Sequence, residues 1–388
     1  MVKVSAGGQR FLALDALRGL AALWVVYFHV FGGLGYLAVD FFLVLSGFIL
    51  SHRYLYGDKQ STPLEFISHR IARLYPLHLY TLLMFLLVHG LVYWTMPNFT
   101  DGTLFTFIQN LTMTHNIGLN PHGLTWNYPS WSVSVEFWVN IVFIFLITRQ
   151  TRSGVLFLLG TLGILVLFMQ HGQLNTQSEN YFGFLNSGLL RGMASFLLGI
   201  LSYRLYLFYC DDWRIKRYAN GLEMVCVLVI IGIVWSRTGK SMGMDVFVPY
   251  IALLMVAIFA FEQGWLSRWL RKLAYLGDIS YSVYLNHLVV LMLFRHWSLQ
   301  YGWSKTTIFG LTLATVLVYS HFTHRYLEIP LGKKLRRGLE WLTSSPPPPV
   351  LVHRPLDQPG IGSDQNNHTE RNPVPGKNGE IVVANVAN

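Results

Sequence analysis

Residues 74–96 read LYPLHLYTLLMFLLVHGLVYWTM, and no Asp, Glu, Lys or Arg interrupts them. A second uncharged segment, residues 153–174, reads SGVLFLLGTLGILVLFMQHGQL. About 20 consecutive apolar residues are enough for a helix to cross the hydrocarbon core of a bilayer. These two segments therefore predict a protein that spans a membrane.

The composition of the whole chain points the same way. Of its 388 residues, 53% are hydrophobic and only 12% are charged, whereas an ordinary soluble domain is about 25% charged. The two cysteines, Cys210 and Cys226, are too few for a disulfide framework or a cysteine-based metal site. The composition therefore excludes a soluble enzyme, a secreted disulfide-rich protein and a disordered regulator.

The apolar segments predict an all-α, polytopic integral membrane protein with ten transmembrane helices. We place these helices near residues 12–31, 36–52, 74–96, 130–148, 153–170, 187–207, 221–236, 245–261, 276–295 and 306–324. With the N-terminus in the cytoplasm, the cytoplasmic segments carry 20 Lys and Arg and the outer loops carry four. Lys and Arg concentrate on the cytoplasmic side of membrane proteins. We therefore expect both termini in the cytoplasm and a multi-pass location in the inner (plasma) membrane.

The same distribution explains the net charge of +10 without a nucleic-acid partner. Residues 1–342 form the predicted transmembrane domain, and the composition changes to SSPPPP directly afterwards. We expect residues 343–388 to be a disordered cytoplasmic tail, because they cannot bury enough apolar surface to fold. The long outer loop, residues 97–129, is rich in Asn, Thr, Gly, His and Trp. Such a loop either binds a polar ligand such as a sugar or is a plain connecting loop.

The first predicted span contains three ionisable residues, Asp15, Arg18 and His29. Ionisable side chains are costly within the membrane and are therefore functional candidates. Arg18 and His29 are 11 residues apart, which places them on one helix face, roughly 16 Å apart along the axis. Asp15 precedes Arg18 by one turn and can pair with it. The alternative is a structural ion pair and a histidine whose ring is satisfied at a helix interface.

A second cluster lies where the inner loop leads into the third span. Arg70 and Arg73 are three residues apart, so they project from the same face of a helix. Paired guanidinium groups bind phosphates through charge-assisted hydrogen bonds. Ordinary anchoring of the span by basic residues explains them equally well.

Polar residues also begin the fourth and ninth spans. Ser132 and Glu136 are one helical turn apart, and Glu136 could orient an imidazole such as His29 as a general base; a helix–helix hydrogen bond is the alternative. Tyr284 and His287 could line a polar cavity, although tyrosines at a bilayer edge often form an aromatic belt. The sequence contains no cluster of metal-ligand residues, so we expect no metal.

With these motifs the chain resembles the acyltransferase 3 family of membrane-bound bacterial O-acyltransferases, in the form without a fused SGNH-type domain. The resemblance runs from about Arg10 to Arg337 and rests on six elements in order. They are LDALRG (14–19) with His29, VDFFLVLSGF (39–48), the Arg70/Arg73 pair, WSVSVE (131–136), ISYSVYL (279–285) with His287, and YLEIP (326–330).

The resemblance implies transfer of an acyl group, usually acetyl, from cytoplasmic acyl-CoA to a hydroxyl of an extracytoplasmic or lipid-linked carbohydrate. Acyl-CoA would be a co-substrate, and no bound cofactor is implied. His29 would be the catalytic histidine, supported by Ser132 and Glu136, and we group Asp15 with them because it pairs with Arg18. Arg18, Arg70 and Arg73 would bind acyl-CoA, and we expect Trp131, Tyr284 and His287 to line the cavity on the acceptor side.

Two mechanisms and two other functions stay open at this stage. His29 could deprotonate the acceptor hydroxyl directly or form an acyl-histidine intermediate. A transporter of a small polar solute would also use buried charges. An inactive relative could serve as a scaffold.

Overall fold

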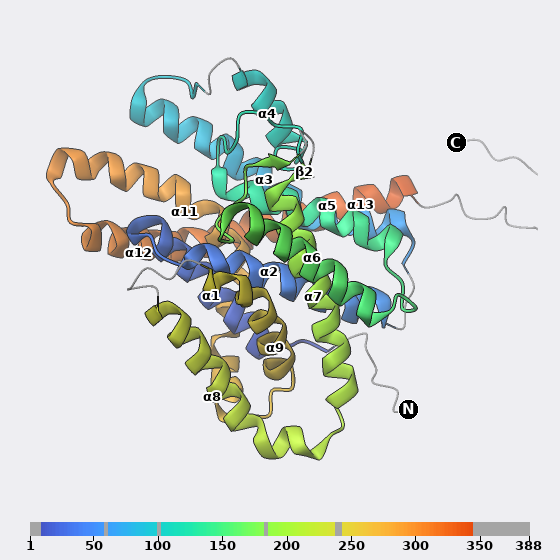
Figure 1. The fold of residues 1–388 in the computed structure, drawn as a ribbon. Helices are drawn as coiled ribbons and strands as arrows, with labels where there is room; N and C mark the ends of the chain where they lie inside the picture. Colours follow the sequence, from blue (N-terminus) through green and yellow to red (C-terminus); the bar gives the residue numbers. More distant parts are fainter. Residues whose placement is uncertain (1–8, 58–60, 99–101, 182–184, 237–242, 344–388) are drawn as a thin grey trace, which may run out of the picture. The chain divides into compact units, whose positions relative to one another are not determined.

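The computed structural model describes residues 9–57, 61–98, 102–181, 185–236 and 243–343, and these residues are helical almost throughout (Figure 1). Two short strands, β1 (Asn180–Tyr181) and β2 (Leu185–Asn186), pair antiparallel with Asn180 opposite Asn186. The predicted all-α fold is confirmed. Of the predicted tail, everything after Thr343 lies outside the described residues.

The longer helices are α1 (Leu12–Phe31), α2 (Ala38–Leu50), α3 (Pro63–Tyr93), α4 (Thr103–Leu111), α5 (Trp131–Leu146), α6 (Ser153–His171), α7 (Ser187–Tyr209), α8 (Trp213–Ser236), α9 (Val248–Ala260), α10 (Trp265–Leu270), α11 (Ala274–Tyr301), α12 (Lys305–Thr323) and α13 (Ile329–Thr343). Single 3-10 turns precede or join several of them, namely η1 (Gly35–Leu37), η4 (Tyr128–Ser130), η6 (Met244–Phe247) and η7 (Arg271–Leu273). Two π-helical turns, η2 (Ser51–Leu55) and η8 (His324–Glu328), extend α2 and join α12 to α13.

Within the described residues, nine helical segments are long and apolar enough to cross a membrane. They correspond to nine of the ten predicted spans. The exception is the span predicted at 245–261, where α9 has only 13 residues. At 1.5 Å per residue it is about 20 Å long, shorter than the hydrocarbon core of about 30 Å. Even with the preceding turn, Met244–Ala260 is a shorter apolar segment than the others.

Two helix pairs meet at glycines, and this close packing positions the polar residues described below. Helices α1 and α11 share the most extensive contact, followed by α2 and α7. A Cβ atom added at Gly277 of α11 would lie 2.2 Å from the Asp15 carbonyl oxygen of α1. A Cβ atom added at Gly199 of α7 would lie 2.0 Å from the Val44 carbonyl oxygen of α2. No side chain fits at either contact, so both helix pairs are held at backbone distance.

The polar loop between α3 and α5 is folded against the helices. His115 is 6% exposed and stacks on His78 of α3, with 5.7 Å between the ring centroids. Asn110 is fully buried and donates to the Thr106 carbonyl oxygen at 2.9 Å. The Asn and His side chains of the loop thus hold it together. The end of the loop lines a small cavity that contains His29.

Candidate active site

A cavity of about 640 Å³ lies among α1, α2, α3, α5 and α11. We call it the arginine cavity. In the described part of the chain, its arginine, carboxylate and histidine side chains are Arg10, Arg18, Arg53, Arg70, Arg73, Asp15, Glu136, Asp278, His52 and His324. The structure thus gathers all three predicted acyl-CoA-binding residues, together with Asp15, Ser132 and Glu136, around one space.

The start of α3 places Arg70 and Arg73. Thr62 accepts a hydrogen bond from the Glu65 backbone N–H at 3.2 Å, and Glu65 accepts one from the Thr62 N–H at 3.1 Å. This reciprocal cap fixes where the helix begins. Arg70 and Arg73 then follow in the second and third turns and reach the cavity from the same face.

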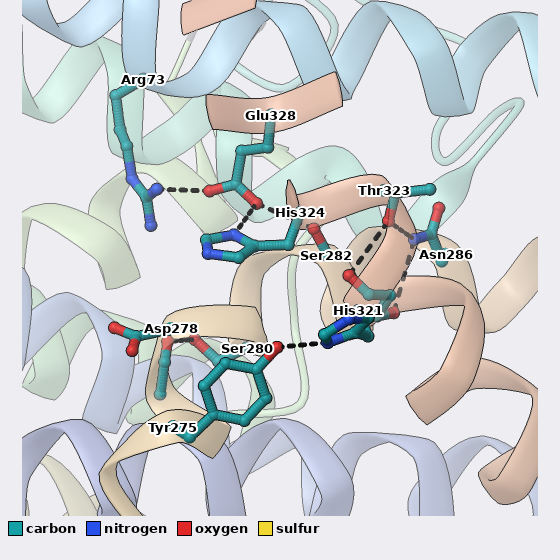
Figure 2. Close-up of polar contacts among 12 residues, drawn as sticks. Arg73, Tyr275, Asp278, Ser280, Ser282, Asn286, His321, Thr323, His324 and Glu328 are labelled. Carbon is teal, nitrogen blue, oxygen red and sulfur yellow. Dashed lines mark hydrogen bonds and ion pairs between the residues drawn. The ribbon is translucent and has the colours of Figure 1, made fainter. Parts of the chain in front are cut away.

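The two arginines differ in how they are paired. Arg73 forms an ion pair with Glu328, which also accepts from Ser282 at 2.8 Å (Figure 2). Arg70 has no ion pair in the described chain, and its Nε atom is buried without a hydrogen-bond partner. An unpaired buried donor is unfavourable, so Arg70 is the arginine most in need of an anion.

Glu328 was not assigned a role from the sequence, although it lies in the YLEIP element. Figure 2 shows its carboxylate between Arg73 and His324, whose Nδ1 lies 3.0 Å from Oε2. The carboxylate is 4% exposed. It therefore fixes the head of Arg73 at the cavity wall and connects α3 to α11 and η8.

Asp15 and Arg18, both on α1, form an ion pair in the wall of the arginine cavity. Arg18 Nη2 lies 2.9 Å from Asp15 Oδ1 and 2.8 Å from the Gly277 carbonyl oxygen. Arg18 Nε donates to Ser280 Oγ at 3.1 Å. Asp15 also pairs with Arg10 at 2.6 Å. Asp15 thus orients two guanidinium groups and does not contact His29.

A second, smaller cavity of about 210 Å³ contains His29. We call it the histidine cavity. Its polar and aromatic wall consists of Phe28, His29, Tyr36, Tyr128, Trp131, Asn175, Gln177, Arg191 and Tyr284. The predicted acceptor-side residues Trp131 and Tyr284 both belong to it. His287 lies directly behind His29.

The expectation that Glu136 orients His29 is wrong. Glu136 lines the arginine cavity, and its hydrogen bond is a long one of 3.4 Å from Ser46 Oγ. Helix α5 starts at Trp131, so Glu136 lies more than one turn further along the helix, on the side of Arg70 and Arg73. In the described chain no carboxylate lies within hydrogen-bonding distance of His29.

His287 occupies the position expected for that carboxylate. Its Nε2 atom lies 3.1 Å from His29 Nδ1, and its own Nδ1 lies 2.6 Å from the Tyr284 carbonyl oxygen. A carbonyl oxygen only accepts, so the His287 proton is on Nδ1 and its Nε2 has a lone pair. His29 then donates from Nδ1, shared with the Val25 carbonyl oxygen at 2.9 Å. The lone pair of His29 is therefore on Nε2.

Tyr284 separates the two cavities, and its side chain lines both of them. Its hydroxyl donates to the Pro129 carbonyl oxygen at 2.9 Å and lies 2.8 Å from Ser132 Oγ. Ser132 Oγ also lies 3.4 Å from the Pro129 carbonyl oxygen, so either hydroxyl can be the donor between Ser132 and Tyr284. Ser132 thus holds the dividing wall in place. Val39 is the other residue that both cavities share.

Arg191 lies within the predicted span 187–207 and was not assigned a role from the sequence. It is 1% exposed and pairs with Asp40, which is fully buried, at 2.5 Å. The cost of a charge in the membrane was the signal that could have singled it out. The structure places it in the histidine cavity. In the described residues no group of three or more His, Cys, Asp or Glu side chains could hold a metal ion.

Comparison with known proteins identifies the family. The family model described as an acyltransferase domain matches residues 11–320. The chain belongs to the acyltransferase 3 family. Residues 11–320 are thus an acyltransferase domain, in a chain whose described part has nine helices long enough to cross a membrane. No solved structure matches it.

Several curated relatives are similar to this chain. "Putative membrane-bound transacylase BcsY" of Komagataeibacter xylinus is 27% identical over 290 residues, which are 71% of this chain and 71% of that protein. "Putative O-acetyltransferase SAR0937" of Staphylococcus aureus strain MRSA252 is 22% identical over 375 residues, 85% of this chain and 59% of that protein. "Protein 2 in picA locus" of Rhizobium radiobacter is 47% identical over 83 residues, 19% of this chain and 43% of that protein. The chain thus spans 43% to 71% of the length of these relatives.

Proposed function

We propose that this membrane acyltransferase transfers an acyl group, most simply acetyl, from acyl-CoA to a hydroxyl of an extracytoplasmic or lipid-linked carbohydrate. We place the protein in the inner (plasma) membrane with the arginine cavity facing the cytoplasm. The observation that carries the proposal is the pair of cavities on the two sides of Tyr284. One offers guanidinium groups, and the other offers an imidazole with a free lone pair.

The donor side is supported by the charges of the arginine cavity. The nucleotide end of CoA carries several phosphate charges, which guanidinium groups bind through strong, charge-assisted hydrogen bonds. Arg70, with its unpartnered Nε, would take one of these phosphate oxygens. Arg18 and Arg73 are held at the wall by Asp15 and Glu328, so they would be oriented before the donor arrives. The carboxylate of Glu136 would reduce the net positive charge of the arginine cavity.

The acceptor side is supported by the tautomer of His29. With its Nδ1 proton directed at His287 and Val25, its Nε2 lone pair can accept the proton of an acceptor hydroxyl. As that proton moves to Nε2, the hydroxyl oxygen forms a bond to the thioester carbon. The carbon–sulfur bond then breaks, and the CoA sulfur takes the proton back from His29. The acyl group ends as an oxygen ester on the acceptor, and free CoA is released.

For the two reactants to meet, the thioester must pass the wall that Tyr284 and Val39 form. The pantetheine arm of CoA is long, flexible and uncharged, so it suits a narrow passage between helices. Ser132, which is hydrogen-bonded to Tyr284, would act on this passage and not on the transferred group. This assigns Ser132 a positioning role.

Ligand binding tests the donor. Acetyl-CoA should raise the Tm of the detergent-solubilised protein, and 3′-dephospho-CoA, which has fewer phosphate charges, should raise it less. The double variant Arg70→Ala, Arg73→Ala should lose most of the shift. A transporter of a polar solute would show no response to any CoA species, and that result would overturn the proposal.

Product analysis tests the acceptor. Surface glycans from a deletion strain should lack one ester mass, which mass spectrometry would detect. Expression of the wild-type chain should restore the mass, and expression of His29→Ala should not. Glycans that keep all their esters in the deletion strain would exclude a carbohydrate acceptor.

A further inference from the structure

The histidine cavity contains a second polar group whose chemistry is unused, the guanidinium of Arg191. Helix α7 carries it into the protein, where it is 1% exposed. Asp40 of α2 accepts two of its hydrogen bonds, from Nε to Oδ1 at 3.0 Å and from Nη2 to Oδ2 at 2.5 Å. The Tyr36 carbonyl oxygen accepts another from Nη2 at 2.9 Å. The guanidinium therefore has one fixed orientation.

One nitrogen of this guanidinium has no partner. Arg191 Nη1 is buried and makes no hydrogen bond, while Arg191 lines the histidine cavity together with His29. The rings of Tyr36 and Trp131 lie 5.6 and 5.9 Å from the central carbon and restrict where that nitrogen can find an acceptor. A buried donor without a partner costs free energy. The residue lines the histidine cavity, so we infer that an acceptor for this nitrogen would come from that cavity.

The surroundings indicate what kind of acceptor fits. Asp40, which is fully buried, neutralises the charge of Arg191, so a permanent anion such as a carboxylate or phosphate would bring an uncompensated charge into a buried site. An oxygen that becomes negative only during the reaction would not. Acyl transfer produces such an oxygen when the thioester carbonyl becomes tetrahedral. Oriented donors that await this oxygen are among the strongest contributions to catalysis.

We propose that Arg191 is a catalytic residue, whose Nη1 donates to the carbonyl oxygen of the acyl group and stabilises the oxyanion of the tetrahedral intermediate. The inference rests on the proposed acyl transfer. As the acceptor oxygen bonds to the thioester carbon, the carbonyl π electrons move to the oxygen that Arg191 binds. When the carbon–sulfur bond breaks, the same electrons re-form the carbonyl, and the hydrogen bond weakens.

Two CoA analogues test this role. S-ethyl-CoA keeps the nucleotide and the arm but has no carbonyl. A trifluoromethyl ketone analogue is hydrated in water and presents a tetrahedral carbon that carries oxygen atoms. The wild-type protein should bind the ketone on the order of 100-fold more tightly than the thioether, because it resembles the transition state. Equal affinity for the two analogues would overturn the inference without any variant.

Two variants assign that preference to Arg191. Arg191→Lys keeps one positive charge for Asp40 but loses the planar fork. The double variant Arg191→Gln, Asp40→Asn removes both charges together and leaves neither one buried alone. Both should bind S-ethyl-CoA as the wild type does, lose the preference for the ketone, and lower kcat on the order of 100-fold or more.

The remaining outcomes separate the inference from the proposed function. An equal loss of affinity for both analogues in the variants would show that Arg191 has a structural role, and it would overturn the inference. A raised KM for the acceptor at unchanged kcat would assign Arg191 to acceptor binding, which also overturns it. Failure of the wild-type protein to bind S-ethyl-CoA would refute the acyl-CoA donor, and with it the function on which the inference rests.

Discussion

The arginine cavity and the histidine cavity share Tyr284, but they differ in whether their arginines are paired with a carboxylate. The larger one, about 640 Å³, contains Arg70 without an ion pair. In the smaller one, about 210 Å³, the guanidinium of Arg191 is already matched by Asp40. An unmatched cation suits a charged ligand that binds and leaves. A matched cation with one nitrogen free of hydrogen bonds suits a change of charge that lasts only during the reaction.

This difference predicts that substitutions in the two cavities have different kinetic effects. Changes in the arginine cavity should alter how tightly the donor binds. Changes in the histidine cavity should alter the rate of transfer once both substrates are bound. The predictions below test that division, beginning with the largest expected effect.

Replacing His29 with Ala should lower acyl transfer by a factor on the order of 1,000 or more, because it removes the base whose contribution is typically 10²–10⁴-fold. Acetyl-CoA should still raise the Tm of this variant, since His29 does not line the arginine cavity. Initial rates with labelled acetyl-CoA and a thermal shift assay measure the two quantities. If His29→Ala kept full activity, the division between the cavities would be wrong.

Replacing Arg70 with Ala should raise the KM for acyl-CoA on the order of 100-fold, because a hydrogen bond to a charged group is worth about 1.5–3 kcal/mol. The kcat at saturating donor should change much less. Arg325→Ala is the matched control, since Arg325 is exposed and does not line the arginine cavity. A fall in kcat with an unchanged KM would place Arg70 at the reacting atoms.

Replacing His287 with Asn should lower kcat roughly 10- to 100-fold, the range found when a group that orients a metal-ligating histidine is removed. The KM for acyl-CoA should stay the same. The pH–rate profile should also move, because His29 Nδ1 loses the lone pair at 3.1 Å and keeps only the Val25 carbonyl oxygen. A uniform loss of folded protein with an unchanged profile would indicate a purely structural role.

The smallest effect concerns the loop that walls the histidine cavity. Burial lowers the pKa of His115 to about 3, from 6.5 in the unfolded chain. The unfolded state therefore binds the proton first as the pH falls below 6.5, and the loop loses stability from there towards pH 3. At pH 5.5 its opening equilibrium should rise about tenfold over that at pH 7.5.

Hydrogen exchange of the amides of residues 112–127, corrected for the intrinsic pH dependence of exchange, measures this opening. The variant His115→Gln keeps a side-chain donor but does not titrate between these pH values. Its opening should therefore depend less on pH. Identical pH dependence in both proteins would show that another group is responsible.

The sequence predicts the helices well and their partners poorly. Uncharged segments such as 153–174 locate α6, because the bilayer imposes a length and an apolar composition on any single helix. The contact of Gly277 with the Asp15 backbone has no comparable signal, since a glycine within a helix occurs for many reasons. This contact nonetheless sets the position of Arg18 beside Ser280.

The candidate site shows the same limit. Asp15, Arg18, Arg70 and Arg73 were selected because charges in or beside a membrane need an explanation, and all four line one cavity. The partner of His29 was predicted wrongly, as Glu136. The residue spacing within α1 or α11 does not show that these two helices pack against each other. Arg191 was passed over because its partner, Asp40, lies 151 residues away in the chain.

The wall at Tyr284 bears on the energy supply of the cell as well as on the reaction. A continuous column of water through the bilayer would let protons follow their gradient and dissipate it. The Tyr284 hydroxyl is bound to Pro129 and Ser132, which holds the residue where the two cavities meet, and a ring held there would narrow the path of such a column. Replacing Tyr284 with a small residue would widen the passage between the cavities. Protons would then leak across the membrane before the passage was wide enough for a larger substrate.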